Sequence, residues 1–391
     1  MSDAPFEVRA RHGRARAGRL RTAHGDVETP VFMPVGTKAA VKTILPSQLE
    51  AAGVEILLGN TYHLTLRPGE ERIGALGGLH RFMAWPRAIL TDSGGYQVFS
   101  LSKRRKVTDD GVEFQSHLDG ATVMLTPERA LAIQRKLGSD IMMPLDEPAS
   151  WPCDGSRLDE SMRRTHAWLA RTVAALGEPN GPAPRERGES KAQMLFGIVQ
   201  GGMDPKRRRA SVEAVCAHGL PGNAIGGLSL GEPAEKLYEV VDVTTSLLPE
   251  DRPRYLMGVG TPADIARAVA MGVDMFDCIL PTRLGRNGWA FTSEGMIKIR
   301  NAEWKEDARP VDSACACPCC ATFSRAYLRH CFNVEEILGL AMLSLHNIHY
   351  YVRLMRRLRT AIRDGTLDSV VARESELCPP LSGRREEEDE R

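Results

Sequence analysis

The segment Met275-Phe-Asp277-Cys-Ile-Leu-Pro-Thr-Arg283-Leu-Gly-Arg286 places a short apolar run directly before an aspartate, with two arginines soon after it. An apolar run that stops at a polar group is typical of a buried strand. The same order of apolar run, polar or glycine-rich stop and helical stretch recurs between residues 55 and 283. Continuous apolar strands that alternate with helices predict a parallel sheet covered on both faces. The runs are Ile56–Leu58, Ala88–Leu90, Asp140–Met143, Leu195–Val199, Ala224-Ile225, Tyr255–Met257 and Met275-Phe276.

Polar side chains or glycine-rich turns follow the ends of these runs. In an α/β barrel the loops that follow the strands form one face, and their residues converge on a single site. A doubly wound open sheet would bring such groups together only near its switch point, and several of them would lie far from the site. We therefore predict an α/β fold, a (β/α)8 TIM barrel. The groups at the ends of the runs are Asn60, Asp92, Asp146, Gln200, Gly226-Gly227, Met257-Gly258 and Asp277.

The rest of the chain divides around this barrel. We expect residues 1–300 to form the barrel, and residues 301–363 to form a zinc-binding subdomain and a C-terminal helix packed on it. Residues 364–391 form a C-terminal extension, which we expect to be disordered at its highly charged end. Alternating residues around an Asp-Gly turn predict a β-hairpin inserted near 99–125. Residues 178–192 are rich in proline, glycine and polar residues, which indicates a mobile surface loop.

Composition limits the class of protein. The chain of 391 residues is 42% hydrophobic and 26% charged, as is typical of a folded globular protein. Its formal charge is only +1, so affinity for nucleic acid would have to come from local basic patches. Such runs occur at 103–106, 206–209 and 353–359, although any one alone is more often solvated surface. The sequence has no apolar stretch of membrane-spanning length and no secretion signal, so we expect a cytoplasmic protein without a membrane partner.

Four of the nine cysteines lie within the segment Cys315-Ala-Cys317-Pro-Cys319-Cys320. Clustered cysteines in odd number favour metal binding in a reducing compartment over a disulfide framework. Thiolates with this spacing, completed by a histidine from elsewhere, suit tetrahedral zinc. The predicted ligands of one structural zinc ion are Cys315, Cys317, Cys320 and His346. Spacing alone leaves Cys319 and His349 as alternative ligands, and buried free thiols as the alternative to a metal.

Aspartates follow three of the apolar runs. Asp277, at the mouth of a barrel, could be a nucleophile, a general base or only a helix cap. Asp92, which precedes Ser93-Gly94-Gly95, could be only a turn residue. With Asp146, however, three strand ends carry an aspartate. A carboxylate that attacks an anomeric carbon, helped by a second carboxyl group that transfers the proton, is the arrangement used in retaining glycosyl transfer.

Several distinctive motifs occur together and in order. They are Asp92-Ser-Gly-Gly-Tyr96-Gln97, Gly197-Ile-Val-Gln200-Gly-Gly202, Ile225-Gly-Gly227-Leu228, Tyr255-Leu-Met257-Gly258-Val-Gly260, Phe276-Asp277-Cys-Ile-Leu-Pro-Thr-Arg283 and the cysteine block with His346-Asn347. This set resembles the bacterial queuine tRNA-ribosyltransferase family, whose members are also called tRNA-guanine transglycosylases. The resemblance spans roughly Phe6 to Arg363, and an ordered set of motifs is far more specific than any single pattern.

The resemblance implies a role for each matching residue. Asp277 matches the nucleophile, which attacks C1′ of the ribose of guanine 34 and forms a covalent intermediate with the RNA. Asp92 matches the general acid/base. The residues that match contacts to the base are Ser93, Gly94, Gly95, Tyr96, Asp146, Gln200, Gly227, Leu228, Glu232 and Met257. The residues that match contacts to the RNA are Gly258, Val259, Gly260, Thr261, Pro262, Ala263, Asp264, Thr282, Arg283, Leu284, Gly285 and Arg286.

Within the base pocket the implied roles differ. The pyrimidine edge of the base would be bound by Asp146 and Gln200, its ring faces by Tyr96 and Met257, and its other polar groups by the backbone of Gly227 and Leu228. Glu232 would sense an aminomethyl group on the incoming base through the Leu228-Ser229 peptide.

The implied reaction replaces guanine 34, at the wobble position of the anticodon, with preQ1 (7-aminomethyl-7-deazaguanine) in queuosine biosynthesis. The implied partner is a tRNA with a GUN anticodon, from the set for Asp, Asn, His and Tyr. The family also forms homodimers and needs no nucleotide or redox cofactor. Leu230, where eukaryotic relatives carry glycine, favours preQ1 over queuine. Pro148 stands where the bacterial pattern usually has cysteine, which leaves the shape of the pocket beside the 7-substituent open.

Two other kinds of protein fit part of the sequence. A non-catalytic, zinc-containing tRNA-binding subunit would have no physical need for both Asp92 and Asp277. A glycosidase or nucleoside hydrolase for small substrates would need the carboxylates, but neither the arginines beside Asp277 nor a zinc module. An archaeal type of transglycosylase, which carries extra C-terminal RNA-binding domains, would need more chain than follows the zinc helix here.

Overall fold

The computed structural model describes residues 5–101, 104–177 and 193–378 of the chain. The expected loop at 178–192 and the charged end of the chain, residues 384–391, lie outside these residues. Among the helices in the described part, none is both long enough and apolar enough to cross a membrane.

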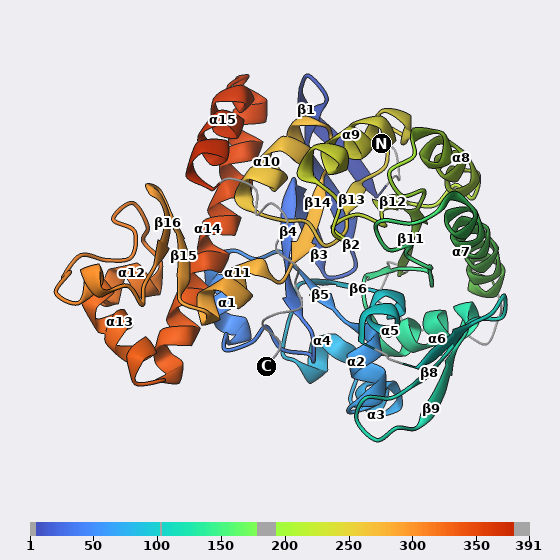
Figure 1. Ribbon diagram of the computed structural model, residues 1–391, viewed down its shortest axis with the longest axis horizontal. Helices are drawn as coiled ribbons and strands as arrows, with labels where there is room; N and C mark the ends of the chain where they lie inside the picture. The colour runs from blue at the N-terminus through green and yellow to red at the C-terminus, as the bar shows by residue number, and fades with distance from the viewer. Residues whose placement is uncertain (1–4, 102–103, 178–192, 379–391) are drawn as a thin grey trace.

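Parallel strands close into a barrel of eight, which confirms the predicted (β/α)8 fold (Figure 1). The strands are β4 (Val31–Gly36), β5 (Ile56–Gly59), β6 (Ala88–Thr91), β10 (Ile141–Met142), β11 (Met194–Val199), β12 (Gly222–Ile225), β13 (Arg254–Leu256) and β14 (Met275–Cys278). Around the barrel the order is β10-β11-β12-β13-β14-β4-β5-β6, and β6 pairs with β10 to complete the circle. Nearly all side chains on these strands are buried, which explains why they read as continuous apolar runs.

The first barrel strand, β4, is not among the predicted runs. It precedes residue 55, where the recognisable pattern begins, and it contains Pro34. A proline within a run argues against an interior strand, because its nitrogen has no hydrogen to donate. In the structure Pro34 lies opposite Cys278, at the end of the pairing between β4 and β14. The strand therefore tolerates Pro34, the residue that prevents its recognition from the sequence.

Helices follow the strands and surround the barrel. The sequence specifies α6 clearly: Thr126 accepts the Arg129 N–H at 3.1 Å as N-cap, Pro127 begins the helix, and Gly138 ends it with φ +73°. The helices in this part are α1 (Pro46–Ala52), α2 (Thr61–Leu66), α3 (Glu70–Ala75), α4 (Gly78–Phe82), α5 (Gly95–Leu101), α6 (Pro127–Leu137), α7 (Gly155–Leu176), α8 (Pro205–Cys216), α9 (Ala234–Leu247), α10 (Pro262–Ala270) and α11 (Leu280–Arg286).

A three-stranded antiparallel sheet, which the sequence analysis does not predict, closes the amino-terminal end of the barrel. Its strands are β1 (Phe6–His12), β2 (Ala15–Thr22) and β3 (Gly25–Thr29). The buried side chains of Phe6, Leu20 and Val27 share one cluster with the inward-facing residues of the barrel strands. This sheet therefore seals the end of the barrel opposite the carboxyl ends of the strands.

Two histidines and an aspartate join this sheet to the barrel. The rings of His24 and His80 stack 3.5 Å apart at 17°. Their nitrogens lie 2.9 and 3.0 Å from the two oxygens of the buried Asp140, which also accepts the backbone N–H groups of His24 and Ile89. A nitrogen lone pair lies in its ring plane, so parallel stacked rings cannot both point at one ion, whereas both can donate to one carboxylate. We interpret the three residues as a hydrogen-bonded clasp, not as a metal site.

The clasp should contribute measurably to stability. Burial alone would raise the pKa of Asp140, but hydrogen bonds from both histidines outweigh it and hold the pKa well below its usual range. Replacing Asp140 with alanine should lower the free energy of unfolding by about 2–4 kcal/mol, because two backbone N–H groups lose their acceptor. Urea unfolding at pH 7 would measure this loss. The control Asp26→Ala removes a partly exposed ion pair with Arg19 and should cost less than about 1 kcal/mol.

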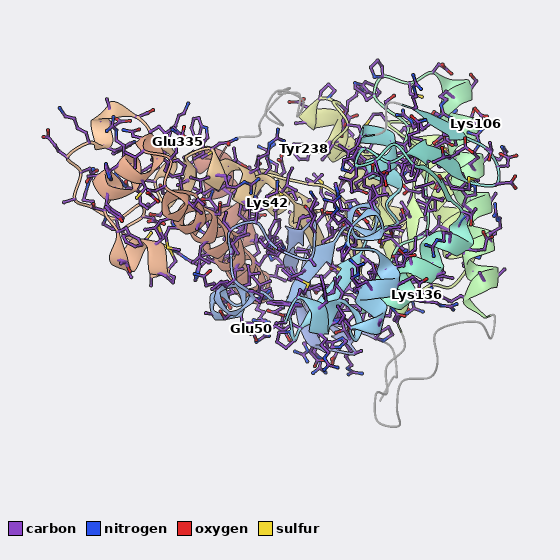
Figure 2. All side chains as sticks on the ribbon, turned by 90° about the horizontal axis from the view of Figure 1, so that it is seen from below. Lys42, Glu50, Lys106, Lys136, Tyr238 and Glu335 are labelled. Atoms are coloured by element: carbon purple, nitrogen blue, oxygen red, sulfur yellow. The ribbon has the colours of Figure 1, made fainter. Side chains whose placement is uncertain are left out.

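The insertion near 99–125 is larger than the predicted hairpin. The hairpin is present as β8 (Val112–Gln115) and β9 (Thr122–Leu125), and β7 (Arg105–Val107) adds a third antiparallel strand. Basic residues before the hairpin belong to this strand, in which Arg105 pairs with Phe114 and Val107 pairs with Val112. Figure 2 shows Lys106 of this sheet at one end of the molecule and Glu335 at the other.

The end carrying Glu335 is a smaller subdomain formed by β15 (Trp289–Thr292), β16 (Gly295–Lys298), α12 (Pro318–Thr322) and α13 (Arg325–Asn333). Ala290 of β15 belongs to the same buried cluster as the cysteines of α12. We therefore assign β15 and β16 to this subdomain, whereas the sequence analysis places residues up to 300 in the barrel. The long helix α14 (Ile337–Asp364) lies between subdomain and barrel (Figure 1).

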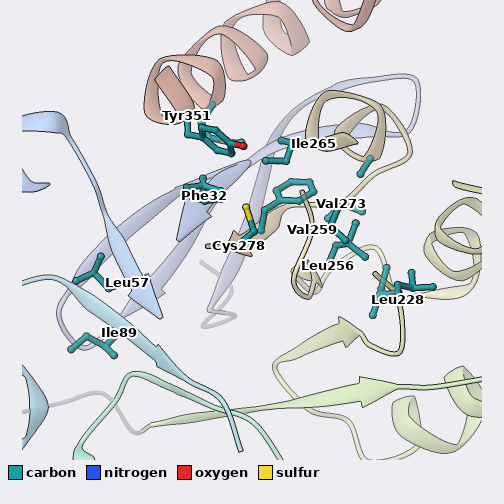
Figure 3. Close-up of a cluster of buried hydrophobic side chains, with 14 of the residues drawn as sticks. Phe32, Leu57, Ile89, Leu228, Leu256, Val259, Ile265, Val273, Cys278 and Tyr351 are labelled. Atoms are coloured by element: carbon teal, nitrogen blue, oxygen red, sulfur yellow. The ribbon is translucent and has the colours of Figure 1, made fainter. Parts of the chain in front are cut away.

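Helix α14 packs closely against the barrel. Tyr351 contacts Phe32 of β4 with ring centroids 4.6 Å apart, and its hydroxyl donates to the Gly260 carbonyl at 3.0 Å (Figure 3). Beyond α14, the helix α15 (Leu367–Leu377) lies within the predicted C-terminal extension. Glu374 of α15 accepts a hydrogen bond from the Tyr350 hydroxyl at 2.8 Å, which holds this part of the extension against α14.

Candidate active site and metal centre

Polar side chains gather at the carboxyl ends of the barrel strands. Asp92 directly follows β6, Gln200 directly follows β11, and Asp277 is the third residue of β14. Asp146 follows the short strand β10 by a few residues. Because the strands are parallel and the barrel is closed, these ends share one face.

Asp92 is a buried carboxyl group held by its neighbours. The Asn60 side chain donates to Oδ2 at 2.6 Å, and the Thr61 backbone N–H donates to Oδ1 at 2.8 Å. Burial raises the pKa of Asp92 to about 6, although these hydrogen bonds oppose the shift. The charge of Asp277 adds to the increase. A carboxyl group with a pKa near neutrality can both release and accept a proton under ordinary conditions.

Asp146 is paired with an amide. Gln200 Nε2 donates to Asp146 Oδ2 at 2.7 Å. Burial raises the pKa of Asp146 to about 7, and the charge of Asp92 raises it further against the opposing hydrogen bond from Gln200. The charge of Asp277 acts on Asp92 and the charge of Asp92 acts on Asp146, so the three carboxyl groups lie near one another. Asp92 and Asp146 are buried, and Asp277 is half-buried.

Asp277 is oriented by two donors. The Tyr255 hydroxyl and the Gly258 backbone N–H bind the same oxygen, Oδ1, at 2.7 and 2.8 Å. Burial raises the pKa of Asp277, and both hydrogen bonds act against that rise. The two donors therefore favour the ionised carboxylate and fix its direction within the barrel mouth.

The loop after β12 requires glycine at two positions. A Cβ atom at Gly226 would lie 2.9 Å from Gln200 Nε2, and one at Gly227 would lie 2.2 Å from Gln200 Oε1. Gly227 also has φ +68°, a conformation that side chains disfavour. The loop backbone thus approaches the Gln200 amide more closely than any other residue type would allow.

Glu232 fixes the next part of this loop. Its carboxylate accepts the backbone N–H groups of Ser229 and, at 2.8 Å, Leu230. In a trans peptide the N–H and C=O groups point in opposite directions. The Leu228 carbonyl therefore points away from Glu232.

The cysteine cluster forms a separate centre in the smaller subdomain. The ligand atoms of Cys315, Cys317, Cys320 and His346 lie within 4.8 Å of one another, and all four residues are buried. His346 Nδ1 is 3.2 Å from Cys320 Sγ, while Nε2 lies 2.8 Å from the Phe291 carbonyl. Because Nε2 donates to that carbonyl, Nδ1 is free of hydrogen and available as a ligand. The cluster could therefore hold a metal ion, and it selects Cys320 over Cys319 and His346 over His349.

Comparison with known proteins identifies the family. The profile described as "Queuine tRNA-ribosyltransferase" matches residues 11–378. A protein of that name from Herpetosiphon aurantiacus is 51% identical over 362 residues, which cover 93% of this chain and 89% of that protein. Another, from Koribacter versatilis, is 53% identical over 359 residues, or 91% of this chain and 93% of the relative. A third, from Thermus thermophilus, is 51% identical over 93% of this chain and 92% of its own length.

The chain belongs to the queuine tRNA-ribosyltransferase family. It is therefore an enzyme, a transferase of the tRNA-guanine transglycosylase type, and the predicted family is confirmed.

The structure places the other residues predicted for a queuine tRNA-ribosyltransferase around the barrel mouth. Ser93 and Gly94 form the turn between β6 and α5, where the Gly94 N–H lies 3.2 Å from Asp92 Oδ1. Tyr96, on α5, has 44% of its surface exposed, and Met257, after β13, is half-buried. Leu228 is buried near the loop after β12 (Figure 3).

The two segments predicted to contact RNA are only partly exposed. In the segment 258–264, Gly258 is exposed, whereas Val259 and Ala263 are almost fully buried. The segment 282–286 lies on α11, where Arg283 and Arg286 are half-buried. A Cβ atom at Gly285 would lie 2.7 Å from Ser344 Cα, so a glycine is required where α11 meets α14.

Several residues of the site carry no predicted role. Asn60 and Thr61 hold Asp92, although only the position of Asn60 at a strand end hints at this. Tyr255 lies inside the run Tyr255–Met257, but its contact with Asp277 depends on the pairing of β13 with β14. Contacts across neighbouring strands leave no signal in the order of residues along the chain.

Proposed function

We propose that the enzyme replaces guanine 34 of a tRNA with preQ1, through a covalent intermediate between Asp277 and the ribose. The observation that carries this proposal is that the buried Asp92 and the half-buried Asp277 lie at one barrel mouth, close enough for the charge of Asp277 to raise the pKa of Asp92. Asp277 is held for attack and Asp92 has a pKa of about 6, suited to proton transfer.

In the first half of the reaction, Asp277 attacks C1′ of the ribose through its second oxygen, Oδ2. The bond from C1′ to the base nitrogen breaks, its electron pair leaves with guanine, and Asp92 supplies the proton that neutralises the departing base. In the second half, Asp92 accepts a proton from the incoming base, whose nitrogen attacks C1′ and displaces Asp277. Two inversions at C1′ give net retention.

The geometry around Gln200 supports a purine-like base. Guanine presents N–H groups on its ring and exocyclic nitrogens, and the Asp146 carboxylate can accept both. We assign Tyr96 and Met257 to its two faces, because stacking binds a base without reading its sequence context. The Leu228 carbonyl points away from Glu232, so it is an acceptor available to the cationic aminomethyl group of preQ1. An anticodon loop is single-stranded, which makes the base accessible at low cost.

Incubation with radiolabelled guanine tests the proposal. Wild-type enzyme should transfer label into unmodified tRNA with a GUN anticodon, and the same tRNA with adenine 34 should remain unlabelled. Subsequent addition of preQ1 should release the label. A non-catalytic tRNA-binding subunit would bind the tRNA without labelling it, and a small-molecule glycosidase would release free base without incorporating any. Either result would contradict the proposed function.

Tyr255→Phe tests the orientation of Asp277. The hydroxyl group stabilises the ionised carboxylate, so its loss should raise the pKa of Asp277 and move the acid limb of the pH profile to higher pH. We expect kcat/KM to fall by about 10- to 100-fold at pH 6, and by less at pH 8, because a hydrogen bond to a charged group is lost. Equal losses at both pH values would contradict this role. Tyr350→Phe, which removes a hydroxyl bonded to Glu374 of α15 instead, is the matched control.

We further propose that the metal is one structural zinc ion. Three thiolates and one imidazole with a fixed tautomer form the donor set of a closed tetrahedral zinc site. Elemental analysis should find about one zinc per chain in the wild type and in Cys319→Ser, but almost none in Cys320→Ser. Zinc loss should also lower the melting temperature of the variant. Full retention of zinc by Cys320→Ser would show that Cys320 is not a ligand.

Homodimer formation is also proposed, with the smaller subdomain near the partner. The subdomain and the start of α14 expose the apolar side chains of Tyr327, Val334 and Ile337, at 42%, 51% and 69% of their surface. Exposed apolar residues that gather in one region are typical of protein interfaces. Light scattering should give the mass of a dimer, and Ile337→Asp should give that of a monomer.

Pro148 bears on the choice of the incoming base. It is half-buried and follows Asp146 by two residues, beside the base pocket. Kinetic comparison of preQ1 with guanine, in the wild type and in Pro148→Cys, would measure its effect on base preference.

A further inference from the structure

Arg208 of α8 is a fully buried cation beneath the site. It has 0% of its surface exposed. Its guanidinium group donates from Nε to the Gly202 carbonyl at 2.9 Å, and from Nη1 to the carbonyls of Val199 and Gly226 at 3.1 and 2.8 Å. The planar guanidinium group thus links the ends of β11 and β12 to the loop that follows β11 through hydrogen bonds.

This cation is costly to bury. Within the described residues Arg208 makes no ion pair, and its Nη2 atom has no hydrogen-bond acceptor. Burial lowers the pKa of Arg208 to about 9, and the more distant charge of Glu232 only partly opposes this. Buried charges can often be replaced by well-packed apolar residues without loss of stability. Stability of the fold alone therefore gives a weak reason for an arginine at this position.

The carbonyls bound by Arg208 flank residues of the base pocket. Val199 directly precedes Gln200, and Gly226 directly precedes Gly227. A Cβ atom at Gly227 would lie 3.6 Å from Arg208 Nη2 and 2.2 Å from Gln200 Oε1. The guanidinium group therefore lies close to both the Gln200 amide and the turn that leads to Leu228.

We propose that Arg208 is a positioning residue for the base. Its fork of donors holds the ends of β11 and β12 at the separation that presents the Gln200 amide and the Leu228 peptide to one purine. This role rests on the proposed function and deepens it. Asp277 lies on β14 and Asp92 directly follows β6, and the hydrogen bonds of Arg208 reach neither strand. Loss of the fork should weaken base binding more than the chemical step.

Kinetics of guanine exchange at saturating tRNA test the proposal. Arg208→Lys keeps a positive charge but cannot reproduce three donors in a planar fork. We expect the KM for free guanine to rise by about 10- to 100-fold, as expected when two of the hydrogen bonds are lost, with kcat changed less than about threefold. The control Arg207→Ala, on the same helix, removes ion pairs with Asp159 and Asp204 and should leave both constants within about twofold.

Arg208→Gln and Arg208→Met extend the series, and the melting temperature reports the folded state of each variant. Gln retains an amide group that can donate hydrogen bonds and should give a smaller rise in KM than Met, which has no donor. The proposal is overturned if the folded variants match Arg207→Ala, or if kcat falls while KM for guanine stays constant. Failure of the wild type to label tRNA at all would contradict the proposed function instead, so the two failures are distinguishable.

Discussion

Asp277→Ala should abolish incorporation of labelled guanine into tRNA, with a loss of at least about 10⁴-fold in kcat, because it removes the proposed nucleophile that forms the bond to C1′. The neighbouring hydrogen-bond donors, Tyr255 and Gly258, would remain in place but would have nothing to orient. The wild type mixed with tRNA should give an adduct that survives denaturing electrophoresis, and the variant should give none.

The variant should fold at least as well as the wild type. Burial raises the pKa of Asp277, so the ionised carboxylate is a cost to the folded state at neutral pH that alanine removes. Thermal unfolding at pH 7.5 would confirm that lost activity is not lost structure. An adduct formed by Asp277→Ala, or exchange above about 1% of the wild-type rate, would assign the nucleophile to another residue.

Asp146→Asn should have the second largest effect and should act in opposite directions on activity and stability. Asparagine keeps an acceptor for Gln200 but cannot accept two N–H groups from guanine. We expect kcat/KM for guanine to fall by about 10²- to 10⁴-fold, since a pocket built for paired hydrogen bonds loses its match with the base.

The effect of Asp146→Asn on the free energy of unfolding should increase with pH. The pKa of Asp146 is about 7 in the folded protein, compared with about 3.9 in an unfolded chain. Because the pKa of Asp146 is higher in the folded protein, protonation of this carboxyl group contributes to the free energy of unfolding. This contribution is fully present below about pH 4 and is lost as pH rises through about 7. The variant should therefore be more stable than the wild type by about 1–3 kcal/mol at pH 8, and by much less at pH 5.

Urea unfolding at both pH values would measure this difference. Asp159→Asn, which alters an exposed carboxylate, is the matched control and should change stability little at either pH. A gain in stability of equal size at pH 5 and pH 8 would contradict the assignment of a raised pKa to Asp146.

The barrel is predictable from the sequence because its strands are buried on both faces and read as unbroken apolar runs. The strand β4 and the sheet β1–β3 escape this pattern for physical reasons. β4 contains Pro34, and alternate side chains of β1 face solvent, so its sequence FEVRARH reads as a charged surface segment. Only the packing of Phe6 against the barrel interior shows that this segment closes an end of the fold.

The sequence predicts most residues of the site, but it does not distinguish between candidate residues that are adjacent in the chain. The structure is needed for that. Cys319 and Cys320 are adjacent in sequence and both are buried, yet only Cys320 shares the cluster with His346. Successive residues of a helix point about 100° apart, so spacing cannot select between them. The contacts of Tyr255 and Arg208 likewise depend on which strands are neighbours, and those pairings join residues distant along the chain.

The sheet β1–β3 has a consequence for the order of events. It packs Phe6, Leu20 and Val27 into one end of the barrel, so under the proposed mechanism both bases use the opposite end, where Asp92 and Asp277 lie. If the proposed covalent intermediate forms, the departing purine and its replacement occupy this site one after the other while the ribose stays bound to Asp277. Guanine and preQ1 should accordingly compete for the same covalent form. Plots of reciprocal rate against reciprocal tRNA concentration, at several fixed concentrations of preQ1, should give parallel lines.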